Sequence, residues 1–394
     1  MKVWRAFLLW LGLLAPVAGM AADADAQPAP FDAAVRELGR TWLAENDGVG
    51  LSIGVYENNR RHFFNFGSAQ LDGNKTPTKD TIYEIGSISK TMAGQLLARA
   101  VIEGRASLDD EAGKYLDESY PNLASGGEKI RLVHLANMTS QLMDMIPDLT
   151  QVRSVPWEPL AVTRMRVLER YKRAEFLTQL HLLAPRRVPG IDLSQSNVAS
   201  MVLGVVLEKI YGEPFADILA REIEKPLRMG SGTAPLIKLL ARGYTEANEP
   251  LPSYSAPTQY ATGSLRYSTD DLLKYAAWQM VERDASVKFA HRPTWTTPDK
   301  LGSVGLFWII GDSPAGRQLQ FSGGTYGFAS FCDLYPDARV AVVLLANKAA
   351  DGAQGSLRAL SAKLVELAAP VEVTAPAGAV SPSPSSAGAP LPVR

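Results

Sequence analysis

The chain has 394 residues, enough for one large domain or two small ones with a sizeable hydrophobic core. Its 40 lysine and arginine residues balance 41 aspartate and glutamate residues, so there is no excess of positive charge to attract nucleic acid or an anionic membrane surface. The composition therefore argues against a nucleic-acid-binding protein and favours a site for a small molecule or a peptide.

The first residues have the features of a secretory signal peptide. Lys2 and Arg5 precede a ten-residue apolar run at residues 6–15, and small residues follow in the stretch VAGMAADADA. The run is too short for a membrane-spanning helix, so we predict a signal peptide at residues 1–21 and a mature chain without a transmembrane span. The alternative is a buried N-terminal helix. With a signal peptide, the protein is exported to the periplasm or secreted.

Apolar periodicity predicts strands at both ends of the mature chain and helices between them. A period near 3.6 indicates helices and a period of two indicates strands. The expected elements are helices at 31–43, 92–104 and 357–367 and strands at 51–56, 62–66, 319–321, 328–335 and 340–346. We therefore predict an α/β (α+β) fold: one antiparallel sheet built from both chain ends, flanked by terminal helices, with a mostly helical insertion at roughly 105–300.

The predicted domain covers residues 22–369, and a stretch of different composition follows it. Residues 370–394 are rich in proline, alanine and serine and have almost no large apolar side chains. Such a segment cannot bury enough apolar surface to offset its loss of conformational entropy, so we predict a disordered tail.

Cys332 is the only cysteine, which excludes an intramolecular disulfide framework and a thiolate metal cluster. It lies in the alternating apolar stretch GFASFCDLYP, with no histidine or asparagine nearby in sequence to activate it. This context indicates a buried strand residue rather than a nucleophile. We predict no metal and no other cofactor.

The stretch EIGSISKTMA, at residues 84–93, places Ser87 three residues before Lys90 at an expected helix start. A serine nucleophile needs a base, and one helical turn brings both side chains to the same face. Lysine can be that base where burial and the helix N-terminus lower its pKa. None of the histidines lies in a G-x-S-x-G context, so a Ser-His-Asp triad has little support. The alternative is that Ser87 only caps the helix.

Several ordered stretches extend this motif into a family resemblance over roughly residues 31–368. They are TIYEIGSISKTM, LVHLANMTSQL, SQSNVASMVLGVVLEKIYGEPF, KPLRMG, ATGSLRYSTDDLLKY, GLFWII and FSGGTYGFASFCDLYPDARVAVVLLANK. In this order they resemble the serine β-lactamase and penicillin-binding-protein superfamily, particularly its class C β-lactamase, esterase and D-aminopeptidase-like branch. The resemblance implies the β-lactamase/transpeptidase-like fold.

The resemblance also implies roles for the residues of the first two motifs. Ser87 matches the acylating nucleophile and Lys90 its base partner. Asn197 matches the amide that orients the lysine and the substrate carbonyl. Gln195 stands where the family has a hydroxyl that relays a proton to the leaving group, and a carboxamide cannot titrate near neutral pH.

The third motif departs from the family as well. Phe321, Ser322 and Gly323 stand where the family has lysine or histidine, then serine or threonine, then glycine. Phe321 cannot bind a substrate carboxylate as the cation does. The oxyanion hole needs only backbone N–H groups, and the resemblance assigns these to Ser87 and Gly324.

Three of these features have a structural alternative. Gly323 and Gly324 are also typical of a strand bulge, and Asn197 is also a suitable helix cap. The segment Met143–Arg173 does not match the family pattern and forms either a substrate entrance or a solvated lid.

We therefore predict an exported serine hydrolase or acyltransferase related to β-lactamases, with a small-molecule or peptide acyl substrate. The acyl-enzyme would form on Ser87, and the substrate would be that of an esterase, a β-lactamase or a peptidase. The missing relay and cation favour a neutral acyl group with a good leaving group. The alternative is a degenerate family member that binds cell-wall peptide, a lipid or a protein partner without turnover.

Overall fold

The computed structural model describes residues 30–57, 59–73, 75–153 and 158–369. The predicted signal peptide at 1–21 and the predicted tail at 370–394 lie outside these ranges. Within the described ranges, no helix is long and apolar enough to cross a membrane.

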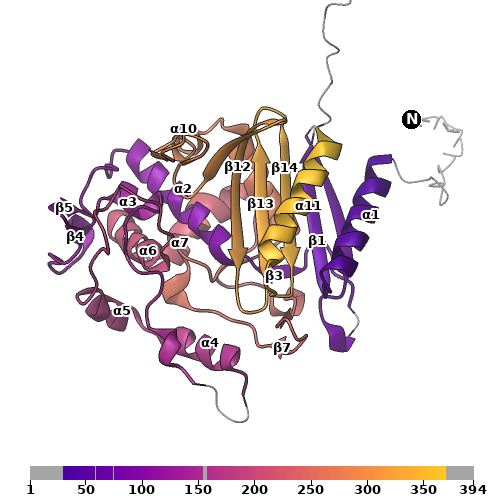
Figure 1. The fold of residues 1–394 in the computed structure, drawn as a ribbon, viewed down its shortest axis with the longest axis horizontal. Helices are drawn as coiled ribbons and strands as arrows, with labels where there is room; N and C mark the ends of the chain where they lie inside the picture. Colours follow the sequence, from indigo (N-terminus) through magenta and orange to yellow (C-terminus); the bar gives the residue numbers. More distant parts are fainter. Residues whose placement is uncertain (1–29, 58, 74, 154–157, 370–394) are drawn as a thin grey trace, which may run out of the picture.

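The centre of the fold is an eight-stranded antiparallel sheet built from both ends of the chain (Figure 1). Its strand order is β2-β1-β14-β13-β12-β11-β10-β9. The strands are β1 (Gly50–Glu57), β2 (Arg60–Gly67), β9 (Trp295–Thr296), β10 (Ser303–Val304), β11 (Ile309–Ser313), β12 (Gly316–Gly324), β13 (Ala329–Tyr335) and β14 (Val340–Ala346). Because β1 pairs with β14 from Leu51–Ala346 to Glu57–Val340, the two chain ends lie side by side and the fold prediction is confirmed.

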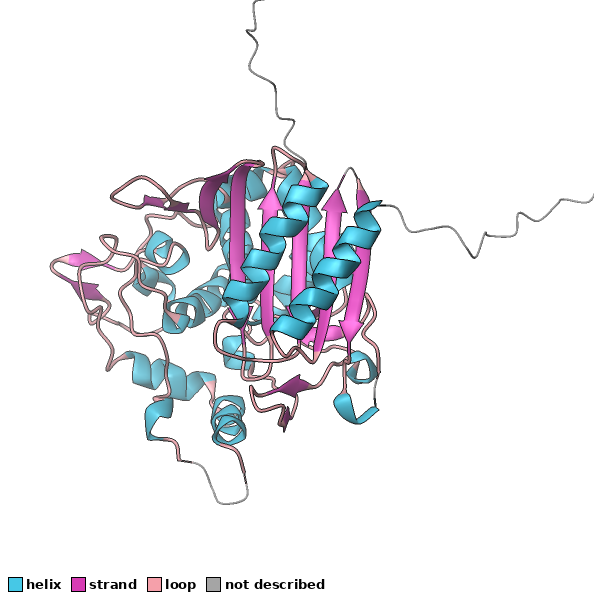
Figure 2. Cartoon of the chain, turned by 45° about the vertical axis from the view of Figure 1, so that its right-hand side comes forward, coloured by secondary structure: helices cyan, strands magenta, loops and turns pink. Residues whose placement is uncertain are grey.

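Both faces of the sheet are covered, and β14 shows how the sequence achieves this. All seven of its residues are buried, since alternate side chains enter two different cores. Val342 and Leu344 point into the core formed with α1 (Pro30–Glu45) and α11 (Ala353–Ala368). These two helices lie together across one face of the sheet (Figure 2).

The opposite face packs on the helical part of the chain. Val343 and Leu345 belong to its core, together with residues of α2 (Ser89–Ile102) and α9 (Thr269–Val281). The other helices are α3 (Leu132–Ala136), α4 (Leu160–Arg170), α5 (Arg173–Leu180), α6 (Asn197–Tyr211), α7 (Phe215–Leu219), α8 (Lys225–Leu227) and α10 (Ala285–Ala290). Short antiparallel pairs join β3 (Ile82–Glu84) to β8 (Arg266–Ser268), β4 (Ala124–Ser125) to β5 (Glu128–Lys129), and β6 (Gly243–Tyr244) to β7 (Pro250–Leu251).

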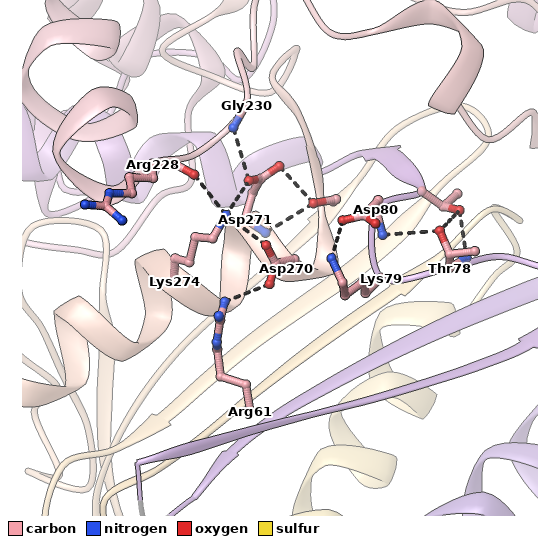
Figure 3. Close-up of polar contacts among 11 residues, drawn as sticks. Arg61, Thr78, Lys79, Asp80, Arg228, Gly230, Asp270, Asp271 and Lys274 are labelled. Carbon is pink, nitrogen blue, oxygen red and sulfur yellow. Dashed lines mark hydrogen bonds and ion pairs between the residues drawn. The ribbon is translucent and has the colours of Figure 1, made fainter. Parts of the chain in front are cut away.

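A network of charged residues joins the start of α9 to its neighbours (Figure 3). Asp270 and Asp271 occupy the first turn of the helix, where carboxylates interact favourably with its positive end. Arg61 of β2 donates to Asp270 over 2.7 Å, and Lys274 donates over 2.9 Å to the carbonyl of Arg228, just after α8. These contacts fix α9 beside the edge of the sheet and beside the helical part.

Cys332 lies in β13 and is fully buried, as predicted. Burial raises the pKa of its thiol well above the ordinary range, and the adjacent Asp333 carboxylate acts in the same direction.

We expect a thiol reagent such as dithionitrobenzoate to leave the folded protein unmodified and to modify one thiol per chain in guanidinium chloride. Rapid modification of the folded protein would contradict the buried position of Cys332. The variant Cys332→Ala, which has no thiol, is the negative control.

Candidate active site

Ser87 and Lys90 meet where the chain passes from β3 into α2. Ser87 lies in the 3₁₀ turn Gly86–Ile88, which leads directly into the helix. Lys90 Nζ lies 2.8 Å from Ser87 Oγ, as the three-residue spacing predicts. The N-cap of α2 is Ile88, without a side-chain capping bond, so Ser87 does not cap this helix.

Lys90 is the buried polar centre of the site. Its side chain is 1% exposed, and Nζ also donates to Asn197 Oδ1 over 2.6 Å and to the carbonyl of Thr262 over 3.2 Å. Burial lowers the pKa of Lys90 to about 7, because the charged ammonium loses its hydration, and the negative charge of Asp144 partly opposes the shift. The amine is therefore partly neutral near neutral pH.

The start of α6 presents Asn197 to the lysine and leaves Gln195 outside the cavity. Ser196 is the N-cap, and its hydroxyl accepts the backbone N–H of Ala199 over 3.0 Å. The Asn197 side chain therefore has no capping role and accepts from Lys90. Gln195 is exposed and is not among the residues that line the cavity around Ser87.

The end of β12 supplies backbone to the site, while Phe321 points into the core. Phe321 is 3% exposed and packs edge-to-face on Phe307, with ring centroids 6.4 Å apart. Ser322 is half-buried. Gly323 and Gly324 pair in register with two successive residues of β13, so this position has no bulge.

Two glycines let the predicted nucleophile segment, residues 85–90, touch β12 closely. Gly86 has φ +53°, and a Cβ atom there would overlap the amide of Gly324. A Cβ atom on Gly323 would overlap the carbonyl oxygen of Ile85 and lie 2.9 Å from Ser87 N. The same Ile85 oxygen accepts the hydroxyl of Ser330 over 2.7 Å. The segments that carry Ser87 and Gly324 are thus in close contact, and both residues line the cavity.

The cavity that opens on Ser87 has a volume of about 270 Å³. Its lining residues are Ser87, Met145, Leu168, Asn197, Tyr254, Gln259, Thr262, Gly263, Gly324, Thr325 and Tyr326. Thr262 and Gly263 lie inside the family-like stretch ATGSLRYSTDDLLKY, which could have indicated them. Met145 and Leu168 belong to the segment Met143–Arg173, for which the sequence left a substrate entrance or a lid open, whereas no sequence pattern indicates that Tyr254 reaches the same cavity. Within the described residues, no cluster of three histidine, cysteine or acidic side chains could hold a metal ion.

Comparisons with known proteins all indicate the same family. The family model described as Beta-lactamase matches residues 31–366. The chain is 22% identical over 356 residues to a beta-lactamase of Pseudomonas fluorescens, covering 78% of this chain and 90% of that protein. It is 24% identical over 321 residues to the D-alanyl-D-alanine-carboxypeptidase/endopeptidase AmpH of Escherichia coli K12, covering 76% of this chain and 80% of that protein.

Solved structures agree on the fold. A class C beta-lactamase superposes with a TM-score of 0.73 at 19% identity, covering 85% of this chain and 96% of the other. A Beta-Lactamase/D-Alanine Carboxypeptidase from Pseudomonas syringae superposes with a TM-score of 0.70 at 20% identity, covering 86% of this chain and 98% of the other. The chain belongs to the beta-lactamase family, within the serine β-lactamase and penicillin-binding-protein superfamily, and the predicted resemblance is confirmed.

The close approach of β12 to the nucleophile segment predicts the effect of a single methyl group. Gly323→Ala should lower the free energy of unfolding by about 1–3 kcal/mol, because the backbone must move to admit the Cβ atom. Gly311→Ala in β11 is the matched control, since its Cβ atom would meet no atom within 4 Å, and its effect should stay within about 0.5 kcal/mol. Urea unfolding measures both, and equal effects would contradict the proposed close contact.

Proposed function

We propose that this protein is a serine hydrolase or acyltransferase that forms an acyl-enzyme on Ser87, with Lys90 as the base. The observation that carries the proposal is the buried Lys90 amine, 2.8 Å from the serine hydroxyl and with its pKa lowered to about 7. A neutral amine can accept the serine proton, whereas a lysine in water is protonated at neutral pH.

The first half of the reaction follows from these positions. Neutral Lys90 takes the proton of Ser87 as Oγ attacks the acyl carbonyl carbon. The negative charge that develops on the carbonyl oxygen is stabilised by the amides of Ser87 and Gly324, and the N-terminal end of α2 adds a positive potential. Asn197 and the Thr262 carbonyl hold the amine in place.

The second half releases both products. When the tetrahedral intermediate collapses, the leaving group departs and the Lys90 ammonium is the nearest proton donor, since Gln195 has no proton to relay near neutral pH. Neutral Lys90 then takes a proton from water or another nucleophile as it attacks the acyl-enzyme, and returns this proton to Ser87 Oγ when the acyl group leaves. Leaving groups that depart without protonation, such as those of activated esters, suit this site best.

The relatives are described as β-lactamases and as a D-alanyl-D-alanine carboxypeptidase/endopeptidase. By likeness, β-lactams, peptides and esters are the substrate classes to consider for this chain. The exposed Gln195 and the core position of Phe321 support a second candidate, a family member that binds such ligands without turnover. Export to the periplasm or the medium remains a prediction from residues 1–21.

The nucleophile is tested by intact-mass analysis after incubation with a fluorophosphonate and with a fluorescent penicillin. We expect one adduct per chain with at least one reagent, and none in Ser87→Ala. Ser89→Ala is the matched control, because this buried neighbour only donates to the Gly86 carbonyl, and it should keep the adduct. If the folded wild-type protein forms no adduct with either reagent, the enzyme proposal is wrong and the binding candidate stands.

The lowered pKa of Lys90 predicts how the labelling rate depends on pH. Only the neutral amine accepts the serine proton, so the fluorophosphonate rate should rise with pH to a midpoint near 7 and level off above it. Asp144→Asn should move the midpoint to lower pH, because it removes a charge that favours the ammonium. Asp148→Asn, also exposed on this loop, should leave it unchanged. A rate constant that is flat from pH 6 to 9 would exclude Lys90 as the base.

A further inference from the structure

The cavity on Ser87 is lined by both polar and apolar side chains. Ser87, Asn197 and Thr262 lie together because each bonds to Lys90 Nζ. The apolar wall of the cavity consists of Met145, Leu168, Tyr254 and Tyr326, which are a thioether, an aliphatic side chain and two aromatic rings. None of the lining residues carries a charge.

Two residues of the apolar wall, Met145 and Leu168, come from the segment that does not match the family pattern. Leu168 and Met165 of α4 form a buried cluster with Tyr254 and Ala256, and Met145, Leu149 and Tyr326 pack against it. This cluster attaches α4 to the turn between β12 and β13, below the end of the sheet (Figure 1). Part of the segment Met143–Arg173 is therefore a wall of the cavity rather than a solvated lid.

The polar atoms of Tyr254 and Met145 are bonded within the protein. The Tyr254 hydroxyl donates to Gln259 Oε1 over 2.5 Å, and Gln259 Nε2 donates to Met145 Sδ over 3.7 Å. The Tyr254 backbone N–H donates over 3.0 Å to Glu84. The surface that Tyr254 and Met145 offer to a ligand is consequently apolar.

The charges behind the wall disfavour a substrate anion. The buried Glu84 carboxyl accepts from Tyr254, and burial raises its pKa to about 7, so it is partly ionised near neutral pH. Lys90 is held by three oxygen atoms, and Phe321 occupies the core. The buried cation Arg266 lies near Glu84 and favours its ionised form, and it does not line the cavity. A carboxylate placed against this wall would therefore lose its hydration without gaining a cation from the lining residues.

Arg164 is the one cation of α4 that lies on the same helix face, four residues before Leu168. It does not line the cavity, although its buried Nε has no hydrogen-bond partner among the described residues. It lies near Tyr326, where burial raises the pKa of the phenol and the Arg164 charge opposes that shift. Arg164 therefore supplies the competing explanation that the experiment must separate.

We infer that Leu168 and Met145, with Tyr254 and Tyr326, form an acyl-binding wall that selects substrates with an uncharged, apolar acyl group. This inference rests on the proposed Ser87 acyl-enzyme. The cavity has a volume of about 270 Å³. Sites for drug-sized ligands have volumes of about 300 Å³ or more, so the acyl group is expected to be a short alkyl chain or a single ring.

The test compares p-nitrophenyl esters, for which kcat/KM of nitrophenol release reports acylation. From acetate to butyrate to hexanoate, kcat/KM should rise roughly fourfold for each methylene group that is buried. The glutarate half-ester and the 5-methylhexanoate ester have acyl groups of the same shape, with and without a carboxylate. The glutarate ester should be at least about tenfold poorer, since its charge must be desolvated.

Variants of α4 assign the selectivity to the wall. Leu168→Ala should lower the hexanoate-to-acetate ratio about fivefold or more, whereas Arg170→Ala, exposed on the opposite face of α4, should leave it within about twofold. Leu168→Arg should raise the glutarate-to-methylhexanoate ratio about tenfold, because it brings a cation to the wall. Thermal unfolding and fluorophosphonate labelling of Ser87 establish that each variant is folded.

The outcomes separate this inference from the proposed function. A wild-type preference for the glutarate ester that Arg164→Met abolishes would show that Arg164 selects an anion, and the inference would be wrong. The inference also fails if the wild-type enzyme is indifferent to the carboxylate, or if Leu168→Ala behaves like Arg170→Ala. If Ser87 forms no adduct and no ester is cleaved, the proposed function itself fails.

Discussion

The desolvated amine of Lys90 is the constraint around which the site is organised. An ammonium group buried in the core is unfavourable, and the protein responds by lowering the pKa and by surrounding Nζ with three oxygen atoms. These oxygens come from Ser87, one turn away, from Asn197 at the start of α6, and from the Thr262 carbonyl. The convergence of these three segments on Nζ offsets part of the cost of burying the amine.

The sheet and the helical part make that convergence rigid. The nucleophile segment lies against β12, with glycines at 86 and 323 where any side chain would collide with backbone. Ser330 of β13 holds the same segment through the Ile85 carbonyl. Because β13 and β14 are buried on both faces, displacement of the nucleophile segment would disturb the largest core of the molecule.

The departures from the family pattern have different structural consequences. Phe321 replaces a cation by core packing against Phe307, so that position contributes to stability rather than to the site. Gln195 is left on the surface beside the site. The apolar wall from α4 then faces a reacting centre without a cation for substrate, which agrees with an uncharged acyl group and not with a carboxylate.

Two features could be predicted from the sequence alone: the sheet built from both chain ends and the Ser87–Lys90 pair. Both depend on local patterns: strand periodicity at 51–56 and 340–346, and a three-residue spacing that one helical turn converts into proximity. The family resemblance added Asn197, which the structure brings to the lysine.

The surroundings of that pair depend on tertiary contacts. The outward position of Gln195, the inward position of Phe321 and the wall of Met145, Leu168 and Tyr254 follow from contacts between segments far apart in the chain. Periodicity identifies which face of an element is apolar, and it does not say which distant element that face will meet. The apolar face of α4 meets Tyr254, Ala256 and Tyr326, and Leu168 of this helix also lines the cavity on Ser87.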